Sequence, residues 1–243
     1  MTGLMAAGRM EWIKLRSLRS TRWIFAAFAV GVVGLATARF QQAHSAGAVP
    51  GQSFGGLLLL APLVGVLGAM TITGEYASGL IRTTLAAVAR RPLVLAAKAA
   101  VVGAVTLVIG EGLAVTAFFL GEALRSMPHA SLAQGSVARA VLMSGAVPGL
   151  IALLGLGLGT LARHTAAALC LVFGILFVLP ILVYLLPLAP LRPYMPLLIA
   201  YNSLGRAQPA AGALGPWPGL LVMCLYTAAA LAVGCAVLVR RDA

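Results

Sequence analysis

Six apolar stretches, each long enough to cross a membrane, account for most of this 243-residue chain. A bilayer core is about 30 Å thick and needs roughly 20 helical residues, so runs of this length predict transmembrane helices. Hydrocarbon offers backbone amides no partner, and an α-helix satisfies its own hydrogen bonds. We therefore predict an all-α, polytopic membrane protein with spans at residues 23–38, 54–73, 99–121, 140–161, 165–186 and 217–239.

The basic residues predict how these spans are oriented. The chain is 61% hydrophobic and only 9% charged, with a mean hydropathy of +1.03 and a net charge of +12. The charges lie at helix ends and not on an aromatic-interleaved soluble face, so we expect no nucleic-acid partner. Twelve of the 17 Lys and Arg residues lie before span one, after spans two and four, or after span six. The positive-inside rule therefore predicts that both termini are cytoplasmic.

This length predicts one transmembrane domain, 1–243, without a second soluble domain. Its expected parts are a cytoplasmic interfacial helix (1–22), spans one and two (23–73) and a cytoplasmic loop (74–98). Spans three to five (99–186), an external segment (187–216) and span six with the C-terminus (217–243) follow. The start of the chain mimics a signal peptide, but its basic region is too long and five more spans follow, so we expect no cleavage.

The loop 74–98 predicts an amphipathic helix between spans two and three. Its apolar side chains recur at helical spacing, in the order Ala77, Leu80, Ile81, Thr84, Leu85 and Val88. Arg82 faces away from this stripe, and Arg90 and Arg91 close the segment with the charge that a helix C-terminus favours. Pro92 suits the first turn of the next helix. Spacing alone leaves two interpretations open: a helix resting on lipid, or a docking element for a cytoplasmic partner.

Two further segments lie at the membrane surface. Residues 8–22 are apolar and basic in alternation, which predicts a second interfacial helix or a basic leader that only sets topology. Before span six, Pro187, Pro190, Pro193 and Pro196 recur at every third residue and forbid a regular helix. The residues between these prolines are apolar, so the segment is either re-entrant in the outer leaflet or a stiff connector on the headgroups.

Within the spans, glycine pairs and one acidic residue stand out. Gly145 with Gly149 and Gly155 with Gly159 are small-xxx-small pairs that let another helix approach closely. Glu111 is the only acidic residue well inside a span, where it either lines a substrate path or bonds to hydroxyls of a neighbouring helix.

Motifs for chemistry are missing from the sequence. It has no P-loop and no motif of a zinc hydrolase or an α/β-hydrolase, so we expect no enzyme and no ATP bound by this chain. Three cysteines and three histidines lack ligand spacing, so we expect no metal site and no cofactor.

Two stretches carry a resemblance to a known family. Residues 11–23 (EWIKLRSLRSTRW) and 71–85 (TITGEYASGLIRTTL), continuing through Arg90, Arg91 and Pro92 to Lys98, resemble the ABC-2 type ABC transporter permeases of bacteria. The similarity extends over the layout of nearly the whole chain. It implies the bacterial plasma membrane and a permease subunit of an ATP-driven exporter. Two permeases, a second copy or a paralogue, would join two separate cytoplasmic ATPase subunits that hold ATP and Mg.

The resemblance also implies roles for individual residues. The helix after span two becomes a coupling helix seated in a cleft of the ATPase. The residues assigned to coupling are Glu75, Tyr76, Leu80, Arg82, Leu85, Arg90 and Arg91. The substrate stays open, since drugs, antibiotics, peptides and lipids all suit an apolar path. The alternative function is an ATP-independent carrier or a channel.

Glu75 has a physical requirement of its own. A carboxylate at the cytoplasmic end of span two lies at the negative end of its own helix dipole, so it needs a compensating cation. The N-terminal helix is the nearest supply of positive charge. We therefore expect a partly buried ion pair from Glu75 to Arg16, Arg19 or Arg22.

Overall fold

A computed structural model describes residues 2–42, 55–87, 91–123, 135–205 and 212–240. All regular structure in these ranges is helical. The elements are α1 (Thr2–Ser17), α2 (Arg19–Gln42), α3 (Gly55–Ser78), α4 (Leu80–Ala87), α5 (Arg91–Ala123), α6 (Gly135–Ala162), α7 (Thr165–Phe173), the π-helical turn η3 (Gly174–Val178), α8 (Leu179–Leu185), the 3-10 helix η4 (Ala189–Tyr194), α9 (Pro196–Gly205) and α10 (Pro216–Arg240).

The expected membrane-spanning helices are present. Five described stretches are long and apolar enough to cross a bilayer, namely Leu60–Ser78, Arg91–Leu120, Ala138–Ala162, Thr165–Leu185 and Pro216–Arg240. A sixth is obtained if α1 and α2, which meet at 71°, are counted as one broken span. The chain is thus a multi-pass helical membrane protein. The predicted start of span two, at residue 54, lies outside the described residues.

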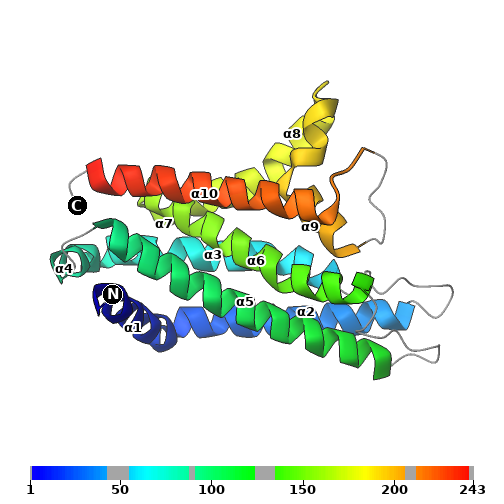
Figure 1. The fold of residues 1–243 in the computed structure, drawn as a ribbon, viewed down its shortest axis with the longest axis horizontal. Coiled ribbons are helices and arrows are strands. Elements are labelled where there is room, and N and C mark those ends of the chain that lie inside the picture. The colour runs from blue at the N-terminus through cyan, green and yellow to red at the C-terminus, as the bar shows by residue number, and fades with distance from the viewer. Residues whose placement is uncertain (1, 43–54, 88–90, 124–134, 206–211, 241–243) are drawn as a thin grey trace.

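Helix α6 lies at the centre of the bundle and is buried along most of its length. It packs against α3, α5 and α10 (Figure 1). Its glycines allow this closeness: a Cβ on Gly155 would lie 2.0 Å from the carbonyl oxygen of Gly65 on α3. At the other pair, a Cβ on Gly110 of α5 would lie 3.0 Å from the Cα of Gly145. The close approach predicted from the glycine pairs is therefore confirmed.

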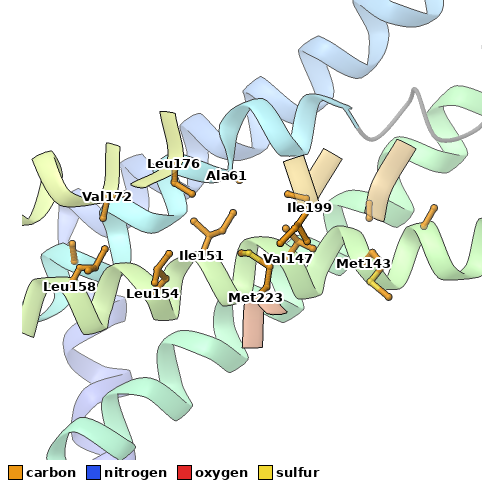
Figure 2. Close-up of a cluster of buried hydrophobic side chains, with 14 of the residues drawn as sticks. Ala61, Met143, Val147, Ile151, Leu154, Leu158, Val172, Leu176, Ile199 and Met223 are labelled. Atoms are coloured by element: carbon orange, nitrogen blue, oxygen red, sulfur yellow. The ribbon is translucent and has the colours of Figure 1, made fainter. Parts of the chain in front are cut away.

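Apolar side chains of α6 fill the space between the surrounding helices (Figure 2). Between lipid-facing helices the hydrophobic effect is weak, so such interlocked side chains hold the helices together mainly through dispersion. The buried set labelled in Figure 2 consists of Ala61, Met143, Val147, Ile151, Leu154, Leu158, Val172, Leu176, Ile199 and Met223.

The fifth span is helical throughout but irregular. A π-helical turn, η3, separates α7 from α8, and α8 leans away from the bundle in Figure 1. Beyond it, the prolines give the 3-10 helix η4 and no α-helix, as their spacing predicts. Helix α9 then begins at Pro196 and buries Ile199 and Ala200 against the spans. Re-entry of this segment into the membrane stays a prediction.

Helices α1 and α4 and the C-terminal end of α10 gather at one end of the bundle, and α9 lies at the other (Figure 1). Which end faces the cytoplasm stays a prediction from the charge distribution. The end of the bundle that contains α1 and α4 also contains several buried charged side chains.

Candidate functional site

Helix α4 is shorter than the sequence predicted, and it is separated from α3 by a turn. Gly79 adopts φ +73°, a left-handed conformation that glycine reaches without steric cost. The turn resets the helical phase, so the expected stripe does not continue from one helix to the next. Ile81 and Thr84 are buried, whereas Ala77 and Leu80 are exposed. The predicted single apolar face is therefore wrong in its first two members.

Four charged side chains and one hydroxyl, which we call the charge cluster, meet beneath α4. The Lys14 ammonium on α1 donates to Glu75 Oε1 at 2.8 Å, to Glu11 Oε1 at 3.3 Å and to Thr84 Oγ1 at 3.0 Å. The Lys98 ammonium on α5 donates to Glu11 Oε2 at 2.5 Å and to Glu75 Oε1 at 2.9 Å. The charge cluster therefore ties α1, α3, α4 and α5 to one another.

Three of the four charged side chains are almost entirely removed from solvent, whereas the Lys14 side chain is 29% exposed. Lys98 is 2% exposed, Glu11 4% and Glu75 7%. Two carboxylates and two ammonium groups balance in charge, which is what allows such groups to be buried. Burial lowers the pKa of Lys14, but the hydrogen bond to Glu75 and the attraction of Glu11 and Glu75 outweigh it and raise that pKa above 10.5. A balanced set of this kind holds firmly but becomes costly when one member is lost.

The cations beside Glu75 differ from those that the sequence suggested. Glu75 does pair with the N-terminal helix, but through Lys14 and not through Arg16, Arg19 or Arg22, which are exposed. Arg19 and Arg22 lie beyond the 71° bend at Leu18, which separates the end of α1 at Ser17 from the start of α2 at Arg19. Arg16 lies on α1 two residues from Lys14 and therefore on another side of that helix. This bend divides the single helix expected over residues 8–22.

Lys98 was absent from the predicted site. The sequence placed it just outside span three, because a lysine normally marks the end of an apolar run. In the structure α5 begins at Arg91, so Lys98 lies two turns inside a continuous helix. A usable signal was the apolar run between Pro92 and Lys98, which continues the pattern of the span that follows.

The other predicted coupling residues are distributed around α4. Tyr76 is half-buried, and the Arg163 guanidinium lies 5.3 Å from the centre of its ring. Leu85 is half-buried against a cluster that contains Ile81, whereas Leu80 and Arg82 are exposed. Leu80 and Arg82 together form an exposed surface of α4, which we call its outward surface.

Arg91 begins α5 and does not close α4 as predicted. Its Nη1 donates to the carbonyl oxygens of Leu238 at 3.1 Å and Val239 at 3.5 Å, at the C-terminal end of α10. Those carbonyls have no partner within their own helix, so a guanidinium satisfies them well. Arg90 and Val88, which the prediction also included, lie outside the described residues.

Glu111 lies apart from the charge cluster, on α5. Its carboxyl group packs against Gly145 of α6, where a Cβ would lie 2.5 Å from the carboxyl carbon. Its Oε1 is buried without a hydrogen-bond partner. Among the described residues no hydroxyl group bonds to this oxygen, and both interpretations of Glu111, a substrate path and a bond to a neighbouring helix, stay predictions.

The described part of the chain contains no group of three or more His, Cys, Asp or Glu side chains arranged to hold a metal ion. Cys170, Cys224 and Cys235 are free thiols. The chemistry that the site offers is thus electrostatic and mechanical: four helices held by buried charges, with a short helix presented outward.

Comparison with known proteins adds no assignment, because neither a family model nor a curated protein sequence matches this chain.

Proposed function

We propose that this chain is the permease subunit of an ATP-driven ABC exporter. It would form the substrate pathway as a dimer, with a second copy or a paralogue, and would couple to two cytoplasmic ATPase subunits that bind ATP and Mg. The observation that carries the proposal is the charge cluster, because it joins the outward helix α4 to three other helices.

The mechanism follows from the contacts of α4. A partner that pushes or pulls α4 acts on Thr84, and through Lys14 and Glu75 the displacement reaches α1 and α3. Lys98 carries it on to α5. Buried groups of this kind resist separation, since an uncompensated charge costs several kcal/mol, roughly 3–5. The four helices would therefore move as one unit.

The outward surface of α4 supplies the docking contact. Leu80 is 51% exposed, and Arg82 is exposed beside it, although the opposite side of α4 is buried. An exposed leucine next to a cation suits a shallow apolar cleft with an acidic edge. The resemblance of residues 71–85 to ABC-2 permeases is the reason for proposing an ATPase as this partner.

Affinity purification of the tagged chain from native membranes tests this docking. We expect an ATPase subunit to co-purify with the wild type and to be lost with Leu80→Asp. Leu191→Asp is the matched control, because Leu191 is similarly exposed (46%) but lies in η4, away from α4. Retention of the ATPase by Leu80→Asp, or its loss from both variants alike, would refute the assignment of α4.

The alternative, an ATP-independent carrier or channel, makes the opposite prediction in reconstituted vesicles. Such a protein would move its substrate without any ATPase, and Leu80→Asp would leave that movement unchanged. An ABC exporter, in contrast, would move its substrate in these vesicles only when both the ATPase and ATP are present.

A further inference from the structure

A cavity of about 380 Å³ lies beside the charge cluster, between α1, α2, α3 and α5, and opens to the surface. Its charged wall consists of Glu11, Lys14, Glu75 and Lys98. Its apolar wall is formed by side chains of α2, α3 and α5, and Leu80 of α4 also lines the cavity. The hydroxyl groups of Ser17, Ser20 and Thr21 line it at the bend between α1 and α2. This volume suits a small polar group together with the start of a hydrocarbon chain.

The charged wall holds an acceptor without a donor. Glu75 Oε1 receives both lysines, but Glu75 Oε2 is buried and has no hydrogen-bond partner. An unpaired buried acceptor is costly, and Glu75 is one of the residues that line the cavity. The two lysines already balance the two glutamates, so an added ammonium would unbalance the charge cluster. A neutral hydroxyl donor is the group that fits.

The part of the cavity at this bend favours an anion. Ser20 and Thr21, in the first turn of α2, line it, and the N-terminus of this 24-residue helix carries partial positive charge. Arg16, Arg19 and Arg22 lie near the bend in the sequence and are exposed, but they do not line the cavity. Hydroxyl groups together with a helix N-terminus favour a phosphate.

The apolar wall completes the pattern. Ile24, Leu67, Val101 and Val102 line the side of the cavity that continues along the spans. Leu67 and Val102 are each 1% exposed, so this wall is held in place by the core behind it. A hydrocarbon chain would cover it at no cost in polar contacts.

We propose that the cavity binds phosphatidylglycerol. A hydroxyl of its glycerol headgroup donates to Glu75, its phosphate lies at the N-terminus of α2 beside Ser20 and Thr21, and one acyl chain covers the apolar wall. The lipid would supply the donor that the charge cluster lacks. This site stands on the cavity alone and does not depend on an ATPase.

Native mass spectrometry of the delipidated, full-length protein in detergent tests the proposal. Phosphatidylglycerol, phosphatidylethanolamine and phosphatidylcholine are added separately. We expect phosphatidylglycerol to bind about tenfold more tightly than phosphatidylcholine, because the choline headgroup has no donor to offer a buried acceptor. Tighter binding of phosphatidylethanolamine would contradict the argument from charge balance.

Variants locate the binding. Met70→Trp fills the cavity from α3. Ser20→Trp fills it from an exposed lining position on α2, so at least the second variant leaves the core intact. Val108→Trp is the control, since Val108 is 70% exposed on α5 and does not line the cavity.

We expect Met70→Trp and Ser20→Trp to abolish the preference for phosphatidylglycerol and Val108→Trp to keep it. Equal binding by wild type and Ser20→Trp, or the absence of any headgroup preference in the wild type, would overturn the assignment.

Discussion

Replacement of Lys98 by methionine tests the charge cluster most severely. Lys98 is 2% exposed and its ammonium contacts two carboxylates, at 2.5 Å and 2.9 Å. Methionine preserves much of the volume but leaves Glu11 Oε2 without its partner and the charge cluster with an excess negative charge. Loss of one partner from a buried ion pair costs roughly 3–5 kcal/mol, which lowers the ratio of folded to unfolded protein by about a hundredfold to several thousandfold.

Tryptophan fluorescence during denaturation in mixed micelles measures this loss. The control is Arg16→Met, which removes an exposed cation from the same region and should change the free energy of unfolding by no more than about 0.5 kcal/mol.

A second variant separates charge from packing. Lys98→Met combined with Glu11→Gln restores the charge balance, so it should lose less stability than the two single variants together. If Lys98→Met behaves like Arg16→Met, or if the two single losses simply add, the four groups do not act as a unit.

Three further predictions follow from other parts of the structure. Gly155→Ala should destabilise the protein by about 1–3 kcal/mol, because its Cβ would collide with the backbone of Gly65, whereas Gly112→Ala, with open space around it, should be neutral or stabilising in the same unfolding assay. Glu111→Gln should unfold no more easily than the wild type, since the buried Oε1 of the carboxyl group has no hydrogen-bond partner to lose; a large loss would mean that the group is paired. The stabilisation from Lys14, whose pKa is raised, should be complete below pH 10.5 and disappear as the pH rises through the higher folded-state value, so the stability difference between wild type and Lys14→Met should shrink only at strongly alkaline pH.

The spans could be read from the sequence because bilayer thickness sets their length. The prediction of span five at 165–186 agrees with Thr165–Leu185 to one residue. The close packing of α6 was also readable, since glycines four residues apart have few other uses within a membrane helix.

The irregular positions were harder to predict, for physical reasons. No proline or glycine lies next to Leu18, so the sequence contains no signal for the bend there. The bend instead depends on the tertiary contacts of α1 with α5. Gly79 was visible, but a glycine within a helical pattern is often tolerated, and only its positive φ shows that it ends α3.

The charge cluster shows where reasoning from the sequence stops. The dipole argument required a cation near Glu75 and pointed to the N-terminal helix. It selected Arg16, Arg19 and Arg22 and left out Lys14, because the sequence does not show which face α1 turns inward. Lys98 was missed because hydropathy treats a lysine as a boundary, and only a folded neighbour with two carboxylates makes it a buried residue.

We propose that this chain works as a permease joined to separate ATPase subunits. Native mass spectrometry of the tagged protein, purified with its partners from native membranes, measures this assembly directly. We expect a complex of two permease chains, identical or paralogous, with two ATPase chains. A chain that purifies without any ATPase, and that still transports its substrate in vesicles lacking ATP, would contradict it.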